Sequence, residues 1–296
     1  MEPYGLPNSP HYDVSVFTGN FTGSVNLTWQ TWTKPAGKAY AHIMLIGGGG
    51  GGGGSGGVTI LEVPLSFLPP RLYIAVPEAR TVFTYSTYVA LQPSNTNPAP
   101  NHILAVANNG GVGGNGSTSA GGIAGNAANV ATAAAMPIGW PFVKTVLAGQ
   151  AGTVGGKSAP TAITLPVTGI RVTGGGGGAG LAGSGVGVNG AGIAVPASPS
   201  YFLNHPGGTG ASATTIPPGA GNSGYRIDNG PGGHFYYGGT GGGSTHATAT
   251  GAGLVQAAGG NGGIGSGGGG MGAALTGSVP AVQSMGGGGM VIITCY

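Results

Sequence analysis

Two uninterrupted glycine runs, at residues 47–54 and 174–178, set the strongest limit on what this chain can fold into. Collagen needs glycine at every third position, so these runs exclude a collagen-like triple helix. A flexible Gly/Ser linker would lack the Val, Ile, Leu and Met residues that interrupt the glycine tracts here. Glycine supplies 70 of 296 residues, whereas average usage is about 7%. The pattern favours an ordered glycine-rich fold.

Fixing so many glycines in one conformation is costly, because each loses roughly 0.5–1 kcal/mol more than alanine on entering regular structure. The compensation must come from close backbone contacts, from apolar layers or from partner subunits. We therefore expect the chain to be stable in an oligomer or as a component of an assembly.

The few charged residues exclude several classes of function. Only 4% of residues are charged, and the eight Lys and Arg form no basic stripe, so nucleic-acid binding is not expected. Cys295 stands alone, which excludes a disulfide within the chain. The first residues lack a basic and apolar leader pattern, and no apolar run approaches the roughly 20 residues of a membrane span. We expect neither a signal peptide nor membrane insertion.

Alternation of apolar and polar residues predicts β-strands in the first third of the chain and at its last residues. The expected strands cover residues 13–17, 24–29, 40–46, 72–76, 81–91, 102–107 and 290–296. We predict an all-β fold, an N-terminal β-sandwich completed by the C-terminal strand. The predicted domains are a β-sandwich at 1–109, completed by 290–296, and a glycine-rich insertion at 110–289.

The predicted insertion has no fixed repeat length, and only residues 126–135 contain helix-favouring alanines. Its glycine tracts are compatible with two arrangements. In one, extended left-handed segments with three residues per turn pack side by side; such segments have no internal hydrogen bonds, so neighbours must supply the partners. In the other, long glycine loops connect ordinary strands.

Four short motifs follow one another along the chain: W-T-K-P-A-G at 32–37, I-M-L-I at 43–46, the glycine run at 47–54 and V-I-I-T-C-Y at 291–296. In this order they resemble the glycine-rich domain of bacteriophage tail fibres and related virion proteins. The stretch from Val63 to the 72–76 strand is also similar to that family. The family commonly has a glycine turn after this strand, whereas this chain has P-E-A-R. The resemblance therefore does not predict the conformation of this turn.

The resemblance implies a virion component, often at a fibre tip that binds the host surface. The localisation it implies is the virion, assembled in the host cytoplasm. Because many virion fibres are trimeric, the resemblance also implies a homotrimer. Its other partners would be further virion proteins and a host surface glycan or outer-membrane protein. The expected function is that of a tail-fibre or receptor-binding adhesin displaying loops on a glycine-rich scaffold. The alternative is a capsid head fibre or decoration protein, and a secreted polysaccharide-acting enzyme is the least favoured reading.

Catalytic motifs give no support for an enzyme. The G-x-S-x-G pattern around Ser55 lies among glycines, with no helix expected after it. Five acidic residues, none close to another in sequence, make a glycosidase carboxylate pair improbable. The six histidines show no metal-ligand spacing. We expect no catalytic residues, no metal site and no cofactor.

Aromatic clusters between the glycine tracts are the candidate contact residues. Aromatic side chains provide large contact area at low entropy cost. They could pack locally over the glycine layers, form a subunit interface or contact a receptor, and the sequence leaves these three roles open. The candidates are Tyr201, Phe202, His205, Tyr225, Arg226, His234, Phe235, Tyr236 and Tyr237.

Overall fold

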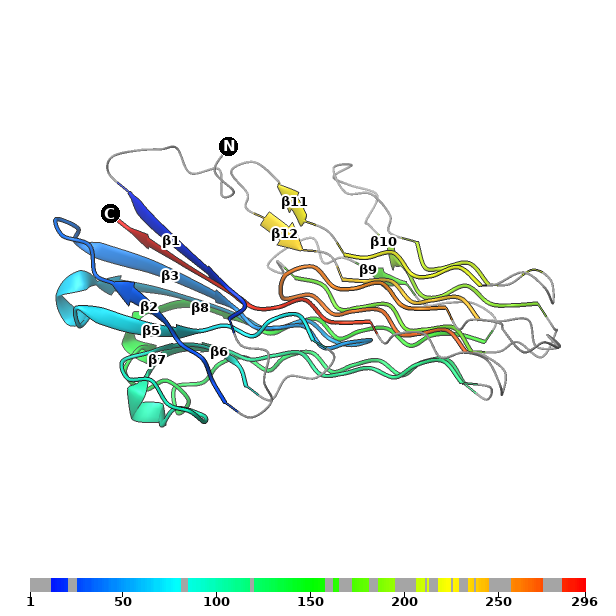
Figure 1. The fold of residues 1–296 in the computed structure, drawn as a ribbon, viewed down its shortest axis with the longest axis horizontal. Coiled ribbons are helices and arrows are strands. Elements are labelled where there is room, and N and C mark those ends of the chain that lie inside the picture. Colours follow the sequence, from blue (N-terminus) through cyan, green and yellow to red (C-terminus); the bar gives the residue numbers. More distant parts are fainter. Residues whose placement is uncertain are drawn as a thin grey trace.

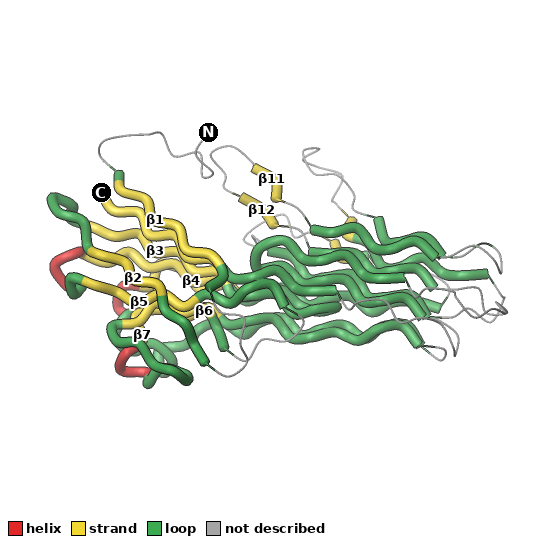
Figure 2. Tube along the Cα trace, in the orientation of Figure 1, coloured by secondary structure: helices red, strands yellow, loops and turns green. Residues whose placement is uncertain are grey.

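The computed structural model is built almost entirely of extended chain (Figures 1 and 2). It describes residues 12–20, 26–80, 85–117, 120–157, 162–164, 172–180, 186–194, 206–210, 212, 218–224, 226–228, 234–236, 238–244, 257–273 and 284–296. Helix is confined, in these residues, to the short 3-10 turns η1 (Leu65–Phe67), η2 (Pro100–His102) and η3 (Trp140–Phe142). The all-β class expected from the sequence is confirmed.

The strands form two larger antiparallel sheets and two small pairs. The five-stranded sheet has the order β1 (Asp13–Thr18), β13 (Met290–Cys295), β3 (Tyr40–Ile46), β4 (Val58–Pro64), β8 (Val143–Leu147). The four-stranded sheet has the order β2 (Gln30–Thr33), β5 (Arg71–Ala75), β6 (Thr87–Ala90), β7 (Ile103–Ala107). The small pairs are parallel β9 (Ile163–Thr164) with β10 (Ile193–Ala194), and antiparallel β11 (Arg226–Asp228) with β12 (His234–Tyr236).

Strand β13 lies between β1 and β3, although nearly the whole chain separates it from both. Ile293 is opposite Ser15 on one side and opposite Ile43 on the other. Val291 and Ile293 are fully buried because alternate residues of β13 face the second sheet. The terminal strand is therefore an interior strand of the five-stranded sheet.

One hydrophobic core is shared by the facing sides of the two larger sheets. Ile43 and Leu45 of β3 belong to the same cluster as Trp32, Leu72 and Ile74 of the four-stranded sheet. The opposite face of the five-stranded sheet carries a second, smaller cluster. This cluster includes Met44, Ile46, Met290 and Ile292, together with Val172 and Ile264 from the glycine-rich part. Two-sided burial explains why β3 and β13 are apolar at nearly every position.

The molecule is elongated, with the two larger sheets at one end and long glycine-rich segments extending from them (Figure 2). Segments far apart in sequence run side by side in this part of the molecule (Figure 1). We call it the glycine body. It comprises the described residues of 47–57, 110–126, 149–156, 172–180, 186–194, 206–224, 238–244, 257–273 and 284–289.

Several local predictions need correction. Residues 26–29 are not a strand: Leu27 is buried, its N–H bonds to Asn95 O, and the Trp29 indole donates to Ser94 O. Residues 126–135, for which the alanines gave only a weak helix signal and no helix was predicted, contain none, and Asn126 O accepts a hydrogen bond from Gly111 of a neighbouring segment. Strands β4 and β8 were not predicted, and β8 falls inside the range assigned to the insertion.

Candidate functional site

Two features stand out in the described residues: the hydrogen-bonded glycine body and a group of tyrosines on the outer face of the five-stranded sheet. In the glycine body, backbone hydrogen bonds join segments at every third residue. Parallel neighbours show this in the bonds Gly267 N–H to Thr173 O, Gly270 N–H to Gly176 O and Ala273 N–H to Ala179 O. Antiparallel neighbours show it in the bonds Gly111 to Asn126, Gly114 to Ile123 and Ser117 to Ala120. A three-residue repeat is not the two-residue repeat of a β-sheet.

Segment 172–180 lies inside the glycine body and is buried along its length. Its backbone exchanges hydrogen bonds with six other segments, namely 47–57, 120–126, 151–156, 187–194, 238–244 and 266–273. A β-strand can pair with only two neighbours, whereas a segment with three residues per turn directs its N–H and C=O groups in three directions around its axis. The segment is therefore bonded on all sides.

At particular glycines this spacing leaves no room for a side chain. A Cβ atom placed on Gly178 would collide with the carbonyl carbon and oxygen of Met271, and one on Gly175 would collide with those of Gly268. The colliding atoms are backbone, which cannot rotate away as a side chain can. Glycine is thus required at these positions by close approach of backbone to backbone.

Buried hydroxyl side chains and more exposed amide side chains connect particular segments of the glycine body. The hydroxyls accept backbone N–H bonds in the pairs Gln150 to Ser55, Gly238 to Thr173, Asn222 to Thr240 and Val188 to Ser244. The amide oxygens accept in the pairs Gly48 to Asn109, Met271 to Asn115, Gly210 to Asn189 and Met285 to Asn261. Because glycine segments look alike at every third residue, these side chains favour one register over the others.

Replacing Thr240 with valine should destabilise the glycine body by about 0.5–1.5 kcal/mol, the usual net contribution of one hydrogen bond. Thr240 is fully buried, and its Oγ1 accepts the Asn222 N–H at 2.7 Å. Valine keeps the shape and removes the acceptor. The measurement is chemical unfolding, with Thr240→Ser as the control that retains the hydroxyl. Equal stabilities for the two variants would contradict the role assigned to this bond.

Three tyrosines lie next to one another at the end of the five-stranded sheet. The Tyr40 and Tyr296 ring centroids are 6.0 Å apart with 22° between the planes, and Tyr12 lies 6.1 Å from Tyr296 with a tilt of 56°. Their exposed fractions are 45% for Tyr12, 44% for Tyr40 and 39% for Tyr296. We call this group, with Glu62 and Lys144, the tyrosine ledge.

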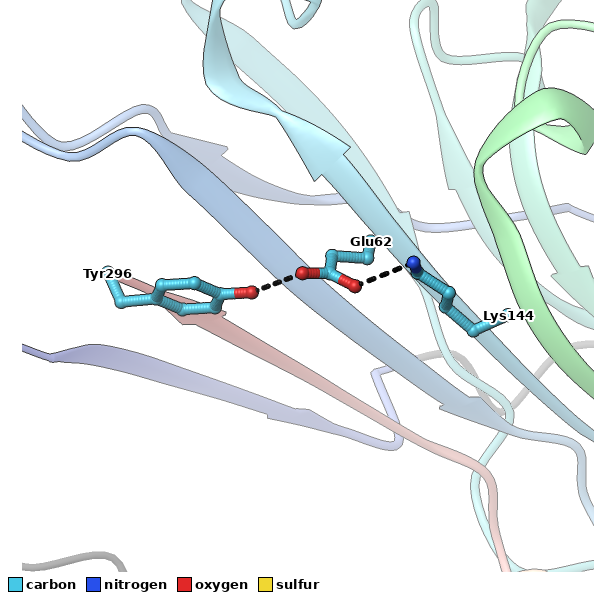
Figure 3. Close-up of polar contacts among 3 residues, drawn as sticks. All are labelled: Glu62, Lys144 and Tyr296. Carbon is cyan, nitrogen blue, oxygen red and sulfur yellow. Dashed lines mark hydrogen bonds and ion pairs between the residues drawn. The ribbon is translucent and has the colours of Figure 1, made fainter.

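Glu62 connects the tyrosines to the edge of the sheet (Figure 3). The Tyr296 hydroxyl donates to Glu62 Oε1 at 2.6 Å, and Lys144 Nζ lies 3.0 Å from Oε2. Both contacts favour the ionised carboxylate, so the pKa of Glu62 lies below its ordinary value of 4.5, with the tyrosine bond as the largest cause. The same bond raises the pKa of Tyr296 to about 12.

The linked pKa values predict a pH dependence. Because the folded pKa of Glu62 is depressed, its contribution to stability is present above the unfolded value near 4.5 and is lost as the pH falls through the folded value. For Tyr296 the contribution is present below pH 10.0 and is lost as the pH rises through about 12. We expect Tyr296→Phe to raise the pKa of Glu62 towards 4.5, measured by NMR titration of its carboxyl carbon. An unchanged Glu62 pKa would contradict the bond.

An apolar cavity of about 640 Å³ lies beside Val63 of β4, whose pairing partner Ala41 follows Tyr40, and so at the same end of the sheet. Its walls include Val63, Leu104, Ile138 and Phe142, and Phe67 at its edge is 70% exposed. The rings of Phe67 and Phe142 are 5.5 Å apart. The lining contains no charged residue, so the cavity lacks the groups needed for acid–base chemistry.

The structure brings together some of the contact residues predicted from the sequence. Arg226 of β11 is opposite Tyr236 of β12, and Phe235 and His234 continue the same pairing. Five other candidates lie outside the described residues: Tyr201, Phe202, His205, Tyr225 and Tyr237. Sequence reasoning missed the tyrosine ledge altogether. Alternation along residues 40–46 places Tyr40 on an outer face, but the neighbouring Tyr296 becomes apparent only once β13 is paired with β3.

Other chemistry finds no support in the described residues. They contain no group of three or more His, Cys, Asp or Glu side chains arranged to hold a metal ion. None of their helices is long and apolar enough to cross a membrane. Cys295 is buried, and burial raises the pKa of its thiol to about 11, which disfavours the reactive thiolate. Neither the protein-family models nor the curated proteins compared with this chain include a match.

Proposed function

We propose that this chain is a structural protein of a bacteriophage virion, a tail-fibre or receptor-binding adhesin that displays loops on a glycine scaffold. The observation that carries the proposal is the position of segment 172–180, bonded to six neighbours through a three-residue repeat. In an arrangement of this kind nearly all backbone N–H and C=O groups form hydrogen bonds with neighbouring segments of the same chain. It suits a rigid support better than a catalytic or transport protein.

In this proposal the scaffold consists of polyglycine II-like helices, the first of the two arrangements considered for the glycine tracts. Support comes from the period of three in both parallel and antiparallel neighbours and from the collisions that any Cβ at Gly175 or Gly178 would cause. The segment 47–57 takes part as well, since Gly175 N–H bonds to Gly53 O. The scaffold thus begins earlier in the chain than residue 110.

The proposed base of the scaffold is a β-sandwich formed by residues 1–109 and completed by the C-terminal strand. Its support is the core shared between the two larger sheets and the place of β13 between β1 and β3. The glycine-rich insertion would then leave the sandwich and return to it. The aromatic segments around β11 and β12, with the paired Arg226 and Tyr236, are the proposed receptor or subunit contacts.

Immunogold labelling of intact particles that carry this protein tests the proposal. Label at the tail tip is the expected result. Label over the head would overturn the adhesin role in favour of the alternative, a capsid head fibre or decoration protein. Particles without label, with the protein present in the lysate, would overturn both. The proposed homotrimer is tested separately by light scattering, which should give three times 28.2 kDa and not 28.2 kDa.

A further inference from the structure

The Tyr296 side chain lies across the five-stranded sheet. Tyr296 follows β13 directly and Glu62 is on β4, while β3 lies between these two strands. Strands two places apart are separated by about 9.5 Å. The 2.6 Å bond between the Tyr296 hydroxyl and Glu62 therefore requires the ring to cross over β3 (Figure 3). In this position Tyr296 is 39% exposed, and its ring neighbours are Tyr40, with 22° between the ring planes, and Tyr12.

The ledge is held in place before any ligand arrives. Tyr40 and Tyr296 exchange backbone hydrogen bonds in both directions, each 3.1 Å long. Tyr296 O accepts a further bond from the Ala39 N–H. The hydroxyl of Tyr296 is fixed by Glu62, and the Glu62 carboxylate is fixed in turn by Lys144. Little side-chain entropy remains to be lost on binding, which favours affinity.

The chemistry of the ledge combines ring faces with hydrogen-bonding groups. A tyrosine face carries partial negative charge and attracts the weakly positive C–H groups of an apolar surface. Each oxygen of the Glu62 carboxylate accepts one of the two bonds described, so lone pairs remain, and the Lys144 ammonium has three donors. A pyranose ring presents the matching pair of surfaces, a C–H face and a rim of hydroxyl groups.

Charge balance narrows the type of ligand. On the ledge the Glu62 carboxylate is paired with the Lys144 ammonium, and His42 is a further polar group close to Glu62. The ledge therefore presents no cluster of like charges that would attract an acidic or a basic partner. We propose that the tyrosine ledge binds a neutral saccharide, with Tyr40 and Tyr296 as the stacking residues and Glu62 and Lys144 as hydroxyl partners.

This site is separate from the aromatic segments around β11 and β12. Only its biological role rests on the proposed attachment function: on a virus particle the ledge would bind a surface glycan while other loops contact the receptor. Its chemistry needs only the described face of the sheet. Purified protein can therefore test it whatever labelling of particles shows.

Affinity electrophoresis of the full chain, through gels containing dextran, mannan or laminarin, tests the ledge, with alginate as the acidic comparison. We expect at least one neutral polysaccharide to retard the protein. Tyr40→Ala and Glu62→Gln should weaken that retardation by about tenfold, the scale of a lost hot-spot contact. Tyr40→Phe keeps the ring and should stay close to wild type. Phe67→Ala, in the apolar cavity, is the matched control for loss of an exposed ring at the same end.

Three results would overturn the proposal. The first is no retardation by any of the three neutral polysaccharides. The second is retardation by alginate alone, and the third is equal retardation of wild type and Tyr40→Ala, since either would exclude stacking on the ledge. Should Tyr40→Ala fail to fold, Tyr40→Leu serves in its place, because leucine keeps much of the side-chain volume but has no aromatic face for a sugar to stack on. An unaltered gel shift in that variant, combined with an unaltered shift in Glu62→Gln, would equally refute saccharide binding.

Discussion

Gly178→Ala is expected to destabilise the protein by about 3 kcal/mol or more, at or above the upper end of overpacking effects. The added methyl group would meet the carbonyl carbon and oxygen of Met271, and Gly270 lies just behind them. Gly178 O also accepts the Gly122 N–H, so any shift of the segment strains a second neighbour. Chemical unfolding, monitored together with hydrogen exchange of the glycine amides, measures the effect.

Gly111→Ala is the matched control for this substitution. Its added methyl group would lie 3.1 Å or more from the nearest atoms, all of which belong to Asn126. A displacement of a few tenths of an ångström relieves that contact, so the loss of stability should be clearly smaller than for Gly178→Ala. Similar losses for the two variants would show that glycine is needed for chain flexibility and not for close packing.

Ile293→Ala should have the largest effect among single truncations in the terminal strand, about 2–5 kcal/mol. The side chain is fully buried in the core that the two larger sheets share. Its removal leaves a cavity between the two larger sheets, beneath a strand whose backbone is bonded to β1 and β3 and cannot move in to fill it. The measurement is the free energy of unfolding from denaturant titration.

Val16→Ala on the adjacent strand β1 is the comparison. Val16 is 37% exposed, so its truncation should cost within about 1 kcal/mol. A loss for Ile293→Ala no greater than for Val16→Ala would mean that β13 contributes little to the core. That result would be compatible with the all-β class, but it would contradict the interior position of β13 in the sheet.

The strands were predictable where alternation or a long apolar run marks them, as in β1, β3, β7 and β13. Strand β4 was missed, although V-T-I-L-E-V-P alternates in part, because it follows the glycine run without a turn signal. Residues 26–29 are the opposite case, because they were predicted as part of a strand and are not one. Their alternation reflects one-sided packing of Leu27 and Trp29 against the 94–95 loop, which periodicity cannot distinguish from a strand.

The arrangement of the glycine body lay beyond the sequence for a different reason. The sequence indicated that neighbours must supply hydrogen bonds, but glycine tracts carry no side chains that specify which neighbour. The partners are chosen in part by isolated polar residues, such as Ser55 and Thr240, that look like ordinary loop residues in the sequence. The tyrosine ledge was hidden likewise, since Tyr40, Glu62 and Tyr296 are joined only through strand order.

The interior place of β13 also has a consequence for the timing of synthesis. Strands β1 and β3 are made early, but they do not pair with each other; each pairs with residues 290–295. Strand β3 can pair with β4 soon after both are made, but β1 cannot join this sheet, and Ile43 and Leu45 lack their neighbours on β13, until residues 290–295 have been made. Contacts of such long sequence separation form slowly. We expect the open edge of this sheet to be more prone to aggregation while the chain is being made than after β13 is in place.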